Sequence, residues 1–362
     1  MYGSRGPVGR HSDYLIPGPG IIVGRKGTVG AVEWSHEPFW PIDTTYYVEP
    51  KGDTDLRWVY WCLSALPLNK LDSSTGVPGL NRYDAYALRV NVPPLPERRR
   101  IARILDTADD AIQHTERVIA KLKAVKVGLL NDLLTRGLDQ HGHLRDPEAH
   151  PEQFKDSRLG RIPTGWHSTP LSEICAIISR GKAPTYVEQS NVLAIGQRCV
   201  QEPGFDPSAA RPQDERRLSD ALLAVPGDVL LNSTGTGTIG RACVFDGMPQ
   251  TYVVDGHVTL LRTHSQRADG RWLNALFQLE AVQQYFASYC YSGSTNQIEL
   301  SRNRLEASRF AVPPAAEQRR IGGILDAADD AIRQTENELA KLRQVKLGLM
   351  DDLLSGKVRV EA

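Results

Sequence analysis

Val92-Pro-Pro-Leu-Pro-Glu97 opens a stretch that continues through Arg99-Arg-Ile101 and Ala108-Asp-Asp-Ala-Ile112. The same pattern returns as Val312-Pro-Pro-Ala-Ala-Glu317, Arg319-Arg-Ile321 and Ala328-Asp-Asp-Ala-Ile332. The offset is 220 residues (317 − 97), and it holds without a gap through Leu133-Leu134 and Leu353-Leu354. A repeated segment of this length, each copy preceded by a different globular segment, implies an internally two-fold molecule. Such a molecule is suited to reading two similar targets at a fixed separation.

Each copy of the repeat is predicted to be one long spacer helix, over residues 93–135 and 313–356, and the first copy is expected to be helical from residue 96. Pro96 suits the start of a helix, and Glu97 favours the positive end of the helix dipole. Apolar residues recur at steps of three and four, which gives one narrow stripe that needs a partner helix, and the obvious partner is the other copy. The predicted stripe includes Val125 and Val345. Its principal seam residues are Ile101, Leu105, Ile112, Ile119, Leu122 and Leu129, with Ile321, Leu325, Ile332, Leu339, Leu342 and Leu349.

Length and composition restrict the class of protein. The chain has 362 residues, room for two or three domains, and carries 43 basic and 43 acidic side chains. A zero net charge counts against a stand-alone nucleic-acid binder, although it leaves room for local basic patches. No apolar run approaches the ~18 residues of a membrane span, and the N-terminus has no apolar signal core, so we expect a cytoplasmic protein. The five cysteines are scattered and are expected to be buried free thiols.

The remaining sequence divides into two globular segments and a connector. Residues 1–92 and 166–312 alternate short apolar runs with Gly and Pro, which predicts short strands, and each has one helix, near Arg57–Leu66 and Arg271–Leu279. Residues 136–165 are polar and read as a connector, and 357–362 form a tail. The two globular segments echo each other faintly. The matching pairs are Gly27–Gly30 with Gly237–Gly240, Ile42-Asp43 with Val254-Asp255, Arg57-Trp58 with Arg271-Trp272, and Leu80–Arg82 with Leu300–Arg302.

Gly235-Thr-Gly-Thr-Ile-Gly240 matches the G-x-G-x-x-G pattern of dinucleotide-binding loops. That reading requires a strand before the loop and a helix after it. The run Arg241-Ala-Cys-Val-Phe245 instead predicts a second strand, so a tight glycine turn between strands is favoured and no cofactor is expected. The hydroxyl groups of the turn are candidate donors to DNA phosphates. They belong to Ser233, Thr234, Thr236 and Thr238, with Thr28 in the first segment.

Basic and amide side chains in predicted loops are the other candidate DNA contacts. Arginine pairs bidentately with guanine, either basic residue neutralises phosphate, and Asn or Gln reads adenine. For any single residue, a solvated surface charge or a turn is the competing interpretation. The candidates are Arg5, Arg10, Arg25, Lys26 and Arg82 in the first segment, and Arg180, Lys182, Asn296, Gln297, Arg302 and Arg304 in the second.

Other polar clusters give no catalytic or metal site. Asp109-Asp110 and Asp329-Asp330 are neighbours on a helix and point about 100° apart, so they are interpreted as outer-face charges that could dock a partner. His141, His143 and His150 lie near one another without a nearby Cys, and no zinc site is expected there. No Ser/His/Asp set can be assembled from the spacing. A non-catalytic protein is therefore predicted.

The order of segments resembles the specificity (S) subunit of type I restriction-modification systems. The helix entry Pro93-Pro-Leu-Pro-Glu97 before Arg98-Arg-Arg-Ile101, the connector Arg145-Asp-Pro-Glu148 to Ser157 and the domain opening Ile162-Pro-Thr-Gly-Trp166 are similar to that family over essentially the whole chain. The resemblance implies an α+β protein. Two globular α/β target-recognition domains would each read half of a bipartite DNA sequence, joined by two helices packed as an antiparallel coiled coil.

The resemblance also implies partners. The paired helices would act as a ruler for the unread spacer and would dock two methyltransferase (M) subunits, to which nuclease-translocase (R) subunits can attach. The S subunit does no chemistry itself. The first segment departs from the pattern, because only 26 residues precede Gly27 whereas about 70 separate Trp166 from Gly237. We therefore expect an N-terminally shortened first domain. The alternative function is a scaffold or half-site reader in which that domain is inactive.

Overall fold

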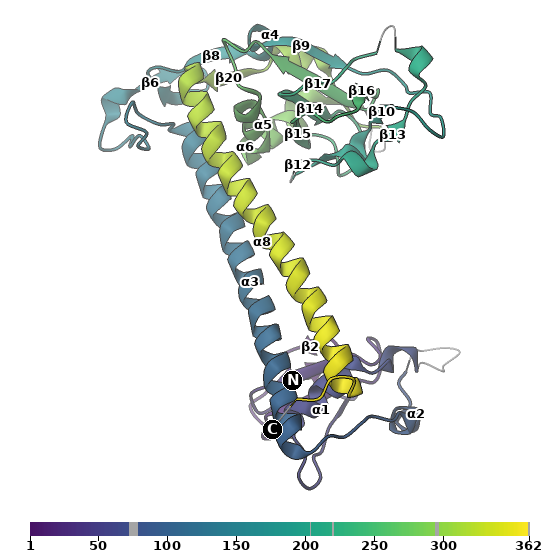
Figure 1. The fold of residues 1–362 in the computed structure, drawn as a ribbon. Coiled ribbons are helices and arrows are strands. Elements are labelled where there is room, and N and C mark those ends of the chain that lie inside the picture. The colour runs from purple at the N-terminus through teal and green to yellow at the C-terminus, as the bar shows by residue number, and fades with distance from the viewer. Residues whose placement is uncertain (72–78, 203, 219–220, 294–296, 361–362) are drawn as a thin grey trace. The chain divides into compact units, whose positions relative to one another are not determined.

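A computed structural model describes residues 1–71, 79–202, 204–218, 221–293 and 297–360. The chain divides into two compact units. Unit 1 comprises residues 1–118 and 335–362, and unit 2 comprises residues 119–334. Each unit therefore contains one globular segment together with part of both long helices, which are labelled α3 and α8 (Figure 1).

The two predicted long helices are confirmed. Helix α3 spans Leu95–Thr135 and α8 spans Ala315–Ser355, so both copies of the repeat are helical over the same 41 residues. In unit 1 the start of α3 packs against the end of α8, and Leu105 shares a core cluster with Leu353. In unit 2 the end of α3 packs against the start of α8, where Leu133 and Leu325 share a cluster. The two helices run antiparallel in both units.

The predicted apolar seam is confirmed along most of its length. Eight of its members are buried: Ile101, Leu105, Ile112, Ile119, Ile321, Leu325, Ile332 and Leu339. Leu122, Leu129, Leu342 and Leu349 are partly buried. The prediction is wrong at Val125 and Val345, which are 50% and 56% exposed. At 3.6 residues per turn the heptad stripe drifts around the helix, and the next residue faces the partner instead.

Those next residues are lysines, and they form ion pairs between the helices. Lys126 pairs with Asp329 in unit 2, and Lys346 pairs with Asp109 in unit 1. The two pairs are equivalent under the 220-residue offset. The prediction that Asp109 and Asp329 are outer-face charges is therefore wrong, because each points along the seam. Their neighbours Asp110 and Asp330 are exposed. Adjacent residues on a helix point about 100° apart, so when one faces the partner helix the next faces solvent.

The N-terminal end of each long helix holds a buried glutamate that binds the segment following the other helix. In unit 1, Glu97 accepts bonds from Arg359 Nε and Nη2, at 2.8 and 2.7 Å, and from the Val360 amide. In unit 2, Glu317 accepts from Arg145 Nη1 at 2.6 Å and from the Leu138 amide at 2.8 Å. Carboxylates at helix N-termini are also favoured by the helix dipole. The repeat thus uses one carboxylate position to fix both chain segments that leave the helices.

The globular part of unit 1 is a small antiparallel sheet in the order β4-β3-β5, covered by one helix. The glycine-flanked apolar run Gly20–Gly24 becomes the central strand β3 and is fully buried. The predicted helix near Arg57–Leu66 is confirmed as α1, which begins at the N-cap Asp55. The other elements are β1 Tyr2–Gly3, β2 Gly6–Pro7, β4 Val32–Ser35, β5 Thr45–Tyr47, α1 Leu56–Ala65, η1 Leu68–Lys70 and α2 Arg82–Ala87.

The globular part of unit 2 is larger and repeats the same plan. Its main antiparallel sheet has the order β15-β14-β17-β9, and a second sheet has the order β13-β10-β16. Strands β14, β15 and β17 match β3, β4 and β5 of unit 1. The strands of the two sheets are β9 Cys175–Arg180, β10 Val192–Ile195, β13 Arg211–Pro212, β14 Asp228–Asn232, β15 Ala242–Phe245, β16 Thr251–Val254 and β17 Val258–Thr263.

Strand β9 has no counterpart among the described strands of unit 1, where β5 forms the edge of the sheet. A pair of strands in unit 2, β8 and β20, also lacks a described counterpart. The remaining elements of unit 2 are η2 Pro151–Gln153, β6 Phe154–Ser157, β7 Gly160–Pro163, β8 His167–Pro170, α4 Leu171–Ile174, η3 Gln197–Cys199, β11 Val200–Gln201, β12 Gly204–Phe205, η4 Pro207–Ala209, η5 Glu215–Arg217, α5 Gly270–Gln278, α6 Glu280–Tyr285, η6 Phe286–Cys290, β18 Tyr291–Ser292, β19 Glu299–Leu300, α7 Arg302–Ala307 and β20 Arg309–Val312.

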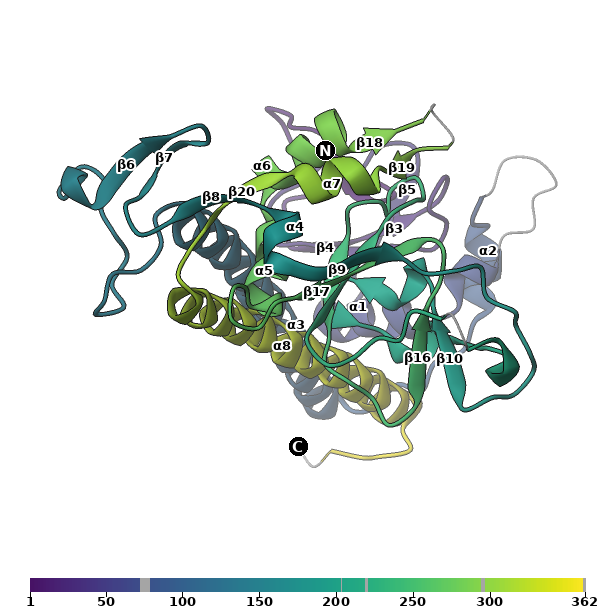
Figure 2. The ribbon, with the colours of Figure 1, turned by 90° about the horizontal axis from the view of Figure 1, so that it is seen from above.

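The predicted helix near Arg271–Leu279 is confirmed as α5, which lies between the main sheet and α8 (Figure 2). Its start approaches α8 so closely that a Cβ on Gly322 would lie 3.3 Å from the Trp272 amide nitrogen. The connector is more ordered than its polar composition suggested. Residues Phe154–Pro163 form the antiparallel hairpin β6–β7, in which Phe154 and Ile162 are buried.

The five cysteines are free and buried, as predicted. Burial raises the pKa of the Cys62, Cys175 and Cys243 thiols to about 12. A thiol with such a pKa is almost wholly protonated near neutral pH, and so it is a poor nucleophile. In the described part of the chain, no helix is both long and apolar enough to span a bilayer.

Candidate nucleic-acid interface

The loops of unit 2 that carry most of the predicted DNA contacts meet at one end of its main sheet. Strands β9 and β14 end there, at Arg180 and Asn232, whereas their antiparallel neighbours β15 and β17 begin there. The loops that join them must therefore lie at the same end. We call residues 180–182, 197, 233–240, 255–257 and 297–300 the unit 2 edge loops.

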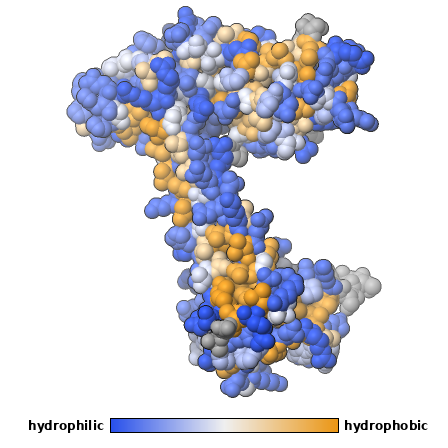
Figure 3. Space-filling model, viewed as in Figure 1, coloured by the Kyte–Doolittle hydropathy of each residue, from blue (hydrophilic) through white to orange (hydrophobic). Residues whose placement is uncertain are grey.

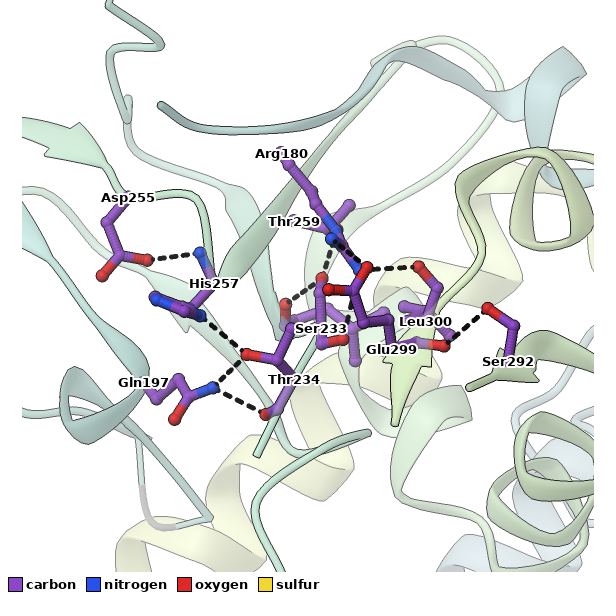
Figure 4. Close-up of polar contacts among 11 residues, drawn as sticks. Arg180, Gln197, Ser233, Thr234, Asp255, His257, Thr259, Ser292, Glu299 and Leu300 are labelled. Atoms are coloured by element: carbon purple, nitrogen blue, oxygen red, sulfur yellow. Dashed lines mark hydrogen bonds and ion pairs between the residues drawn. The ribbon is translucent and has the colours of Figure 1, made fainter. Parts of the chain in front are cut away.

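Arg180 ties three of these loops together (Figure 4). Its Nη2 donates to the Leu300 carbonyl at 2.9 Å and to the Ser233 carbonyl at 3.3 Å. Its Nη1 donates to Glu299 Oε2 at 3.0 Å. Because its guanidinium is committed to holding the loops, Arg180 acts here as a positioning residue. A direct DNA contact remains a prediction for this residue, and it would have to coexist with these bonds.

Three polar residues that the sequence reasoning did not select also shape this end of the sheet. The Thr234 hydroxyl lies 2.9 Å from His257 Nδ1, and Gln197 Nε2 donates to the Thr234 carbonyl at 2.7 Å. Asp255 Oδ1 accepts from the His257 amide at 2.7 Å, and burial raises the pKa of its carboxyl group. The only sequence signal among them is the faint match of Val254-Asp255 with Ile42-Asp43, because Gln197 is far from Asp255 and His257 in sequence and meets them only when β10 pairs with β16.

The glycine motif forms a tight turn between two strands, as predicted. It links β14 to β15, which pair antiparallel, so the helix that a dinucleotide loop requires is replaced by a strand. Gly235, Gly237 and Gly240 have φ values of +96°, +81° and +85°. Residues with a Cβ are strained in that region, which explains why three glycines occur in six positions.

The hydroxyl groups of this turn are not equally accessible. Ser233 is fully buried, and its hydroxyl bonds to Thr259 Oγ1 and the Leu231 carbonyl. Its position therefore does not support the predicted phosphate contact, since a buried and satisfied hydroxyl supports the loop instead. Thr236 is exposed. Thr234 and Thr238 are partly exposed, and Thr238 Oγ1 donates to the carbonyls of Thr234 and Gly235 at 3.3 Å.

The other candidates in unit 2 differ in their surroundings. Lys182 is exposed beside Asp255, and Gln297 is exposed beside β19. Arg302 forms an ion pair with Glu306 on α7, and both residues line a groove of about 340 Å³. Arg304 Nη1 donates to the Tyr289 carbonyl at 3.1 Å and thereby fixes α7 to the preceding segment. Asn296 lies outside the described residues.

Unit 1 builds a corresponding set of edge loops from the basic residues predicted in its sequence. Arg5 Nε donates to Thr28 Oγ1 at 2.8 Å, and the Arg25 guanidinium lies 5.7 Å from the centre of the Tyr46 ring. Lys26 pairs with Gly79 in an isolated bridge. We call residues 4–5, 25–29, 43–46 and 79–82 the unit 1 edge loops. They therefore include Arg82, whereas Arg10 is exposed in the segment after β2.

The two glycine turns match in a register that differs slightly from the predicted one. The Gly30 amide bonds to the Gly24 carbonyl in unit 1, and the Gly240 amide bonds to the Asn232 carbonyl in unit 2. The bridge Lys26–Gly79 corresponds to the bridge Thr234–Glu299, which places Gly27 opposite Gly235 rather than Gly237. The unit 2 turn is thus two residues longer, and Arg25 and Lys26 occupy the places of Ser233 and Thr234.

No cluster of three or more metal-ligating side chains occurs among the described residues, and His141, His143 and His150 make only local contacts in the connector. Both sets of edge loops contain arginine, lysine, hydroxyl and amide groups at one end of a sheet. Such groups can bind phosphates and read the edges of bases.

Comparison with known proteins identifies the family. A model described as the type I restriction modification DNA specificity domain matches residues 1–124 and 163–344. The chain is 24% identical, over 303 residues, to the type I restriction enzyme MjaVIII specificity subunit of Methanocaldococcus jannaschii, covering 81% of this chain and 68% of that protein. It is 23% identical, over 293 residues, to the putative MjaX specificity subunit of the same organism, covering 78% and 62%.

Solved structures share the fold. The S subunit of a type I restriction-modification system from M. genitalium superposes with a TM-score of 0.64 at 16% identity, covering 98% of this chain and 87% of that one. A chain from a type I system studied for complex assembly and conformational transition superposes with a TM-score of 0.53 at 18% identity, covering 95% and 83%. The chain therefore belongs to the type I restriction-modification DNA specificity family. It is a non-catalytic DNA-recognition subunit, as the sequence resemblance implied.

Proposed function

We propose that this chain reads a bipartite DNA sequence, with the edge loops of each unit reading one half. The observation that carries the proposal is the duplication of these loops. Both units form the same glycine turn at the same end of the same antiparallel sheet, and they fill it with different polar side chains. A common frame with different side chains is expected of two modules that bind DNA alike and recognise different bases.

The long helices are proposed to dock two methyltransferase subunits. In support, each copy of the repeat exposes an apolar pair on its outer face, Val125 and Val127 on α3 and Val345 and Leu347 on α8. These side chains are 50–66% exposed and equivalent under the 220-residue offset. A surface that occurs twice favours two copies of one partner. Nuclease-translocase subunits would join through the methyltransferases, and the complex would work in the cytoplasm.

The first experiment is a methylome of a host lacking other methyltransferases, expressing this chain with a cognate methyltransferase subunit. A modified sequence in two parts with a fixed spacer is expected. Modification of a single half-sequence, or of a palindrome of one half, would instead favour the half-site reader. That alternative draws on the smaller first domain, in which β5 has no described outer neighbour. Loss of all modification with methyltransferase binding intact would favour the scaffold.

A matched pair of lysines tests the unit 1 edge loops directly. Lys26 lies in these loops, and Lys51 is exposed in the segment after β5, at the opposite end of the sheet. If Lys26 neutralises a phosphate, Lys26→Ala weakens binding to all DNA sequences alike and reduces the salt dependence by about one ion. Lys51→Ala is expected to change neither quantity. Equal effects of the two changes, measured by fluorescence anisotropy over a salt series, would remove the proposed interface.

The helices are proposed to set the distance between the two half-sequences. Inserting seven residues into each helix preserves the seam register and adds about 10 Å, which is about three base pairs of B-DNA. We expect the modified sequence to gain about three unread base pairs while both halves stay the same. A changed half-sequence with an unchanged spacer would exclude the ruler.

A further inference from the structure

Unit 1 contains an open groove of about 540 Å³ beside the end of α8. One wall is α8, with Met350 and Leu354, and another is the end of α1, with Cys62 and Leu66. The third is the extended segment Arg89–Asn91. Figure 3 shows hydrophobic side chains gathered on the surface at this end of α8.

The internal repeat shows what covers the equivalent surface in unit 2. The segment Arg309–Val312 corresponds to residues 89–92, and there it forms β20, which pairs with β8. Phe310 and Val312 are 8% and 7% exposed, whereas their counterparts Val90 and Val92 are 41% and 64% exposed. Among the described residues, none forms a backbone–backbone hydrogen bond with residues 89–92. A segment of this kind with exposed valines can act as a strand edge that accepts another strand.

A tryptophan fills the rest of the equivalent space. Trp166, just before β8, is 1% exposed and belongs to the core cluster with Leu130 and Leu134 at the end of α3. It lies so close to the end of α3 that a Cβ on Gly137 would be 2.4 Å from its ring. In unit 1 the counterparts of the two leucines are Met350 and Leu354, which are only partly buried.

At the end of α8, a Cβ on Gly356 would lie 3.8 Å from Asn91 Nδ2. Asn91 also donates to the Ser355 carbonyl at 2.6 Å. The Asn91 side chain therefore supplies a hydrogen-bond donor to a carbonyl at the end of α8. It does not cover the apolar surface beside that end.

We propose that the groove of unit 1 is the docking site of a polypeptide segment that carries a tryptophan followed by a short β-strand, the chemistry that residues 166–170 supply in unit 2. The strand pairs with residues 89–92 by β-augmentation, and the tryptophan covers Met350 and Leu354. The ends of α3 and α8 are apolar at equivalent positions, Leu130 and Leu134 in unit 2 and Met350 and Leu354 in unit 1. A segment that packs on the end of α3 therefore has the chemistry to pack on the end of α8. The proposal concerns what covers the end of α8 in unit 1 and does not depend on which DNA sequence is read.

The probe is a fluorescent peptide with the sequence of residues 161–174, titrated into the full chain. Saturable one-to-one binding is expected, together with slower hydrogen exchange of the amides of residues 89–92. Val90→Asp is expected to weaken binding at least tenfold, and so is a peptide in which the tryptophan is replaced by alanine. Leu15→Asp is the control, because Leu15 is also an exposed apolar residue of unit 1 but does not line the groove. It should leave binding unchanged.

Three results would overturn the proposal. No saturable binding would show that the groove does not accept this chemistry. Protection at residues 309–312 in place of 89–92 would show that the peptide only exchanges with its own copy in unit 2. Protection of residues 89–92 without peptide, together with a concentration-dependent dimer, would assign the groove to a second copy of this chain.

Discussion

In both units an arginine of the globular segment forms an ion pair with the start of one long helix. The units differ in how completely the globular segment covers the end of the other long helix. Arg57 on α1 pairs with Asp106 on α3, and Arg271 on α5 pairs with Asp326 on α8, again 220 residues apart at the helix. In unit 2 the end of α3 lies beneath Trp166 and strand β8, whereas in unit 1 the end of α8 lines an open groove. The anchors do not need the covering segment, so an incompletely covered domain can still be held on the scaffold.

The largest expected contrast in unfolding free energy is between Glu97 and Glu317, the buried glutamates at the N-terminal ends of the two long helices. Glu317 and Arg145 have side chains only 10% and 15% exposed, whereas Arg359, which binds Glu97, is 68% exposed. Glu317→Ala would strand a buried guanidinium and cost about 3–5 kcal/mol of unfolding free energy. Glu97→Ala should cost clearly less, because Arg359 can return to water. Urea unfolding of both variants measures this, and equal losses would contradict the comparison.

Leu134 and Leu354, equivalent leucines near the ends of α3 and α8, test how far each helix end is covered. Leu134 is 5% exposed beneath the covering segment, and its counterpart Leu354 is partly buried in the groove wall. Leu134→Ala should cost about 3 kcal/mol, because it leaves a cavity in a packed core. Leu354→Ala should cost about 1 kcal/mol, in proportion to the smaller buried area. If unfolding experiments gave Leu354→Ala the greater loss, the groove would have to be filled already.

The two arginine anchors are expected to differ by a smaller amount. The Arg57 guanidinium lies 4.7 Å from the centres of the Trp34 and Tyr60 rings, and it is less exposed than Arg271. Double-mutant cycles should give a coupling of about 1 kcal/mol for Arg57 with Asp106 and about half of that for Arg271 with Asp326. The reverse order would mean that the lower exposure of Arg57 does not strengthen its ion pair with Asp106.

The smallest expected effect is the pH dependence of the stability that Glu97 contributes through its bonds to Arg359 and Val360. The bonds from Arg359 and from the Val360 amide hold the pKa of the Glu97 carboxyl group below its usual range. A carboxyl group whose pKa is lowered on folding contributes stability above its usual pKa, and that contribution is lost as the pH falls through the lowered value. The stability difference between the wild-type chain and Glu97→Gln should therefore shrink on acidification. A difference that stays constant from pH 6 to pH 3 would rule out this role.

The architecture was readable from the sequence to the extent that it depends on local patterns. The repeat, both long helices, the buried seam at residues such as Ile101 and Ile321, and the glycine turn before Gly240 were all predicted correctly. Periodicity and turn chemistry are properties of neighbouring residues, so a single sequence displays them. The family followed from the same motifs and is confirmed by the family model.

The site was only partly readable, because its geometry depends on residues distant in the chain. Arg5 and Thr28 were both selected as candidates, yet their hydrogen bond could not be foreseen, and Gln197 and His257 carried no local signal. Ser233 was selected because it stands in the turn, but pairing of β14 with β17 buries its hydroxyl against Thr259.

The sequence by itself determined that this protein has two similar halves, each built on a long helix with one apolar stripe, since repetition and periodicity are written in residue order. Only the tertiary structure decided which helical neighbours face inward, so that Lys126 and Lys346 replace the predicted Val125 and Val345. It also decided that the surface covered by Trp166 in unit 2 lines an open groove in unit 1. Both depend on which surfaces come into contact after the chain has folded. The burial of a residue is set by those contacts and cannot be read from the residue alone.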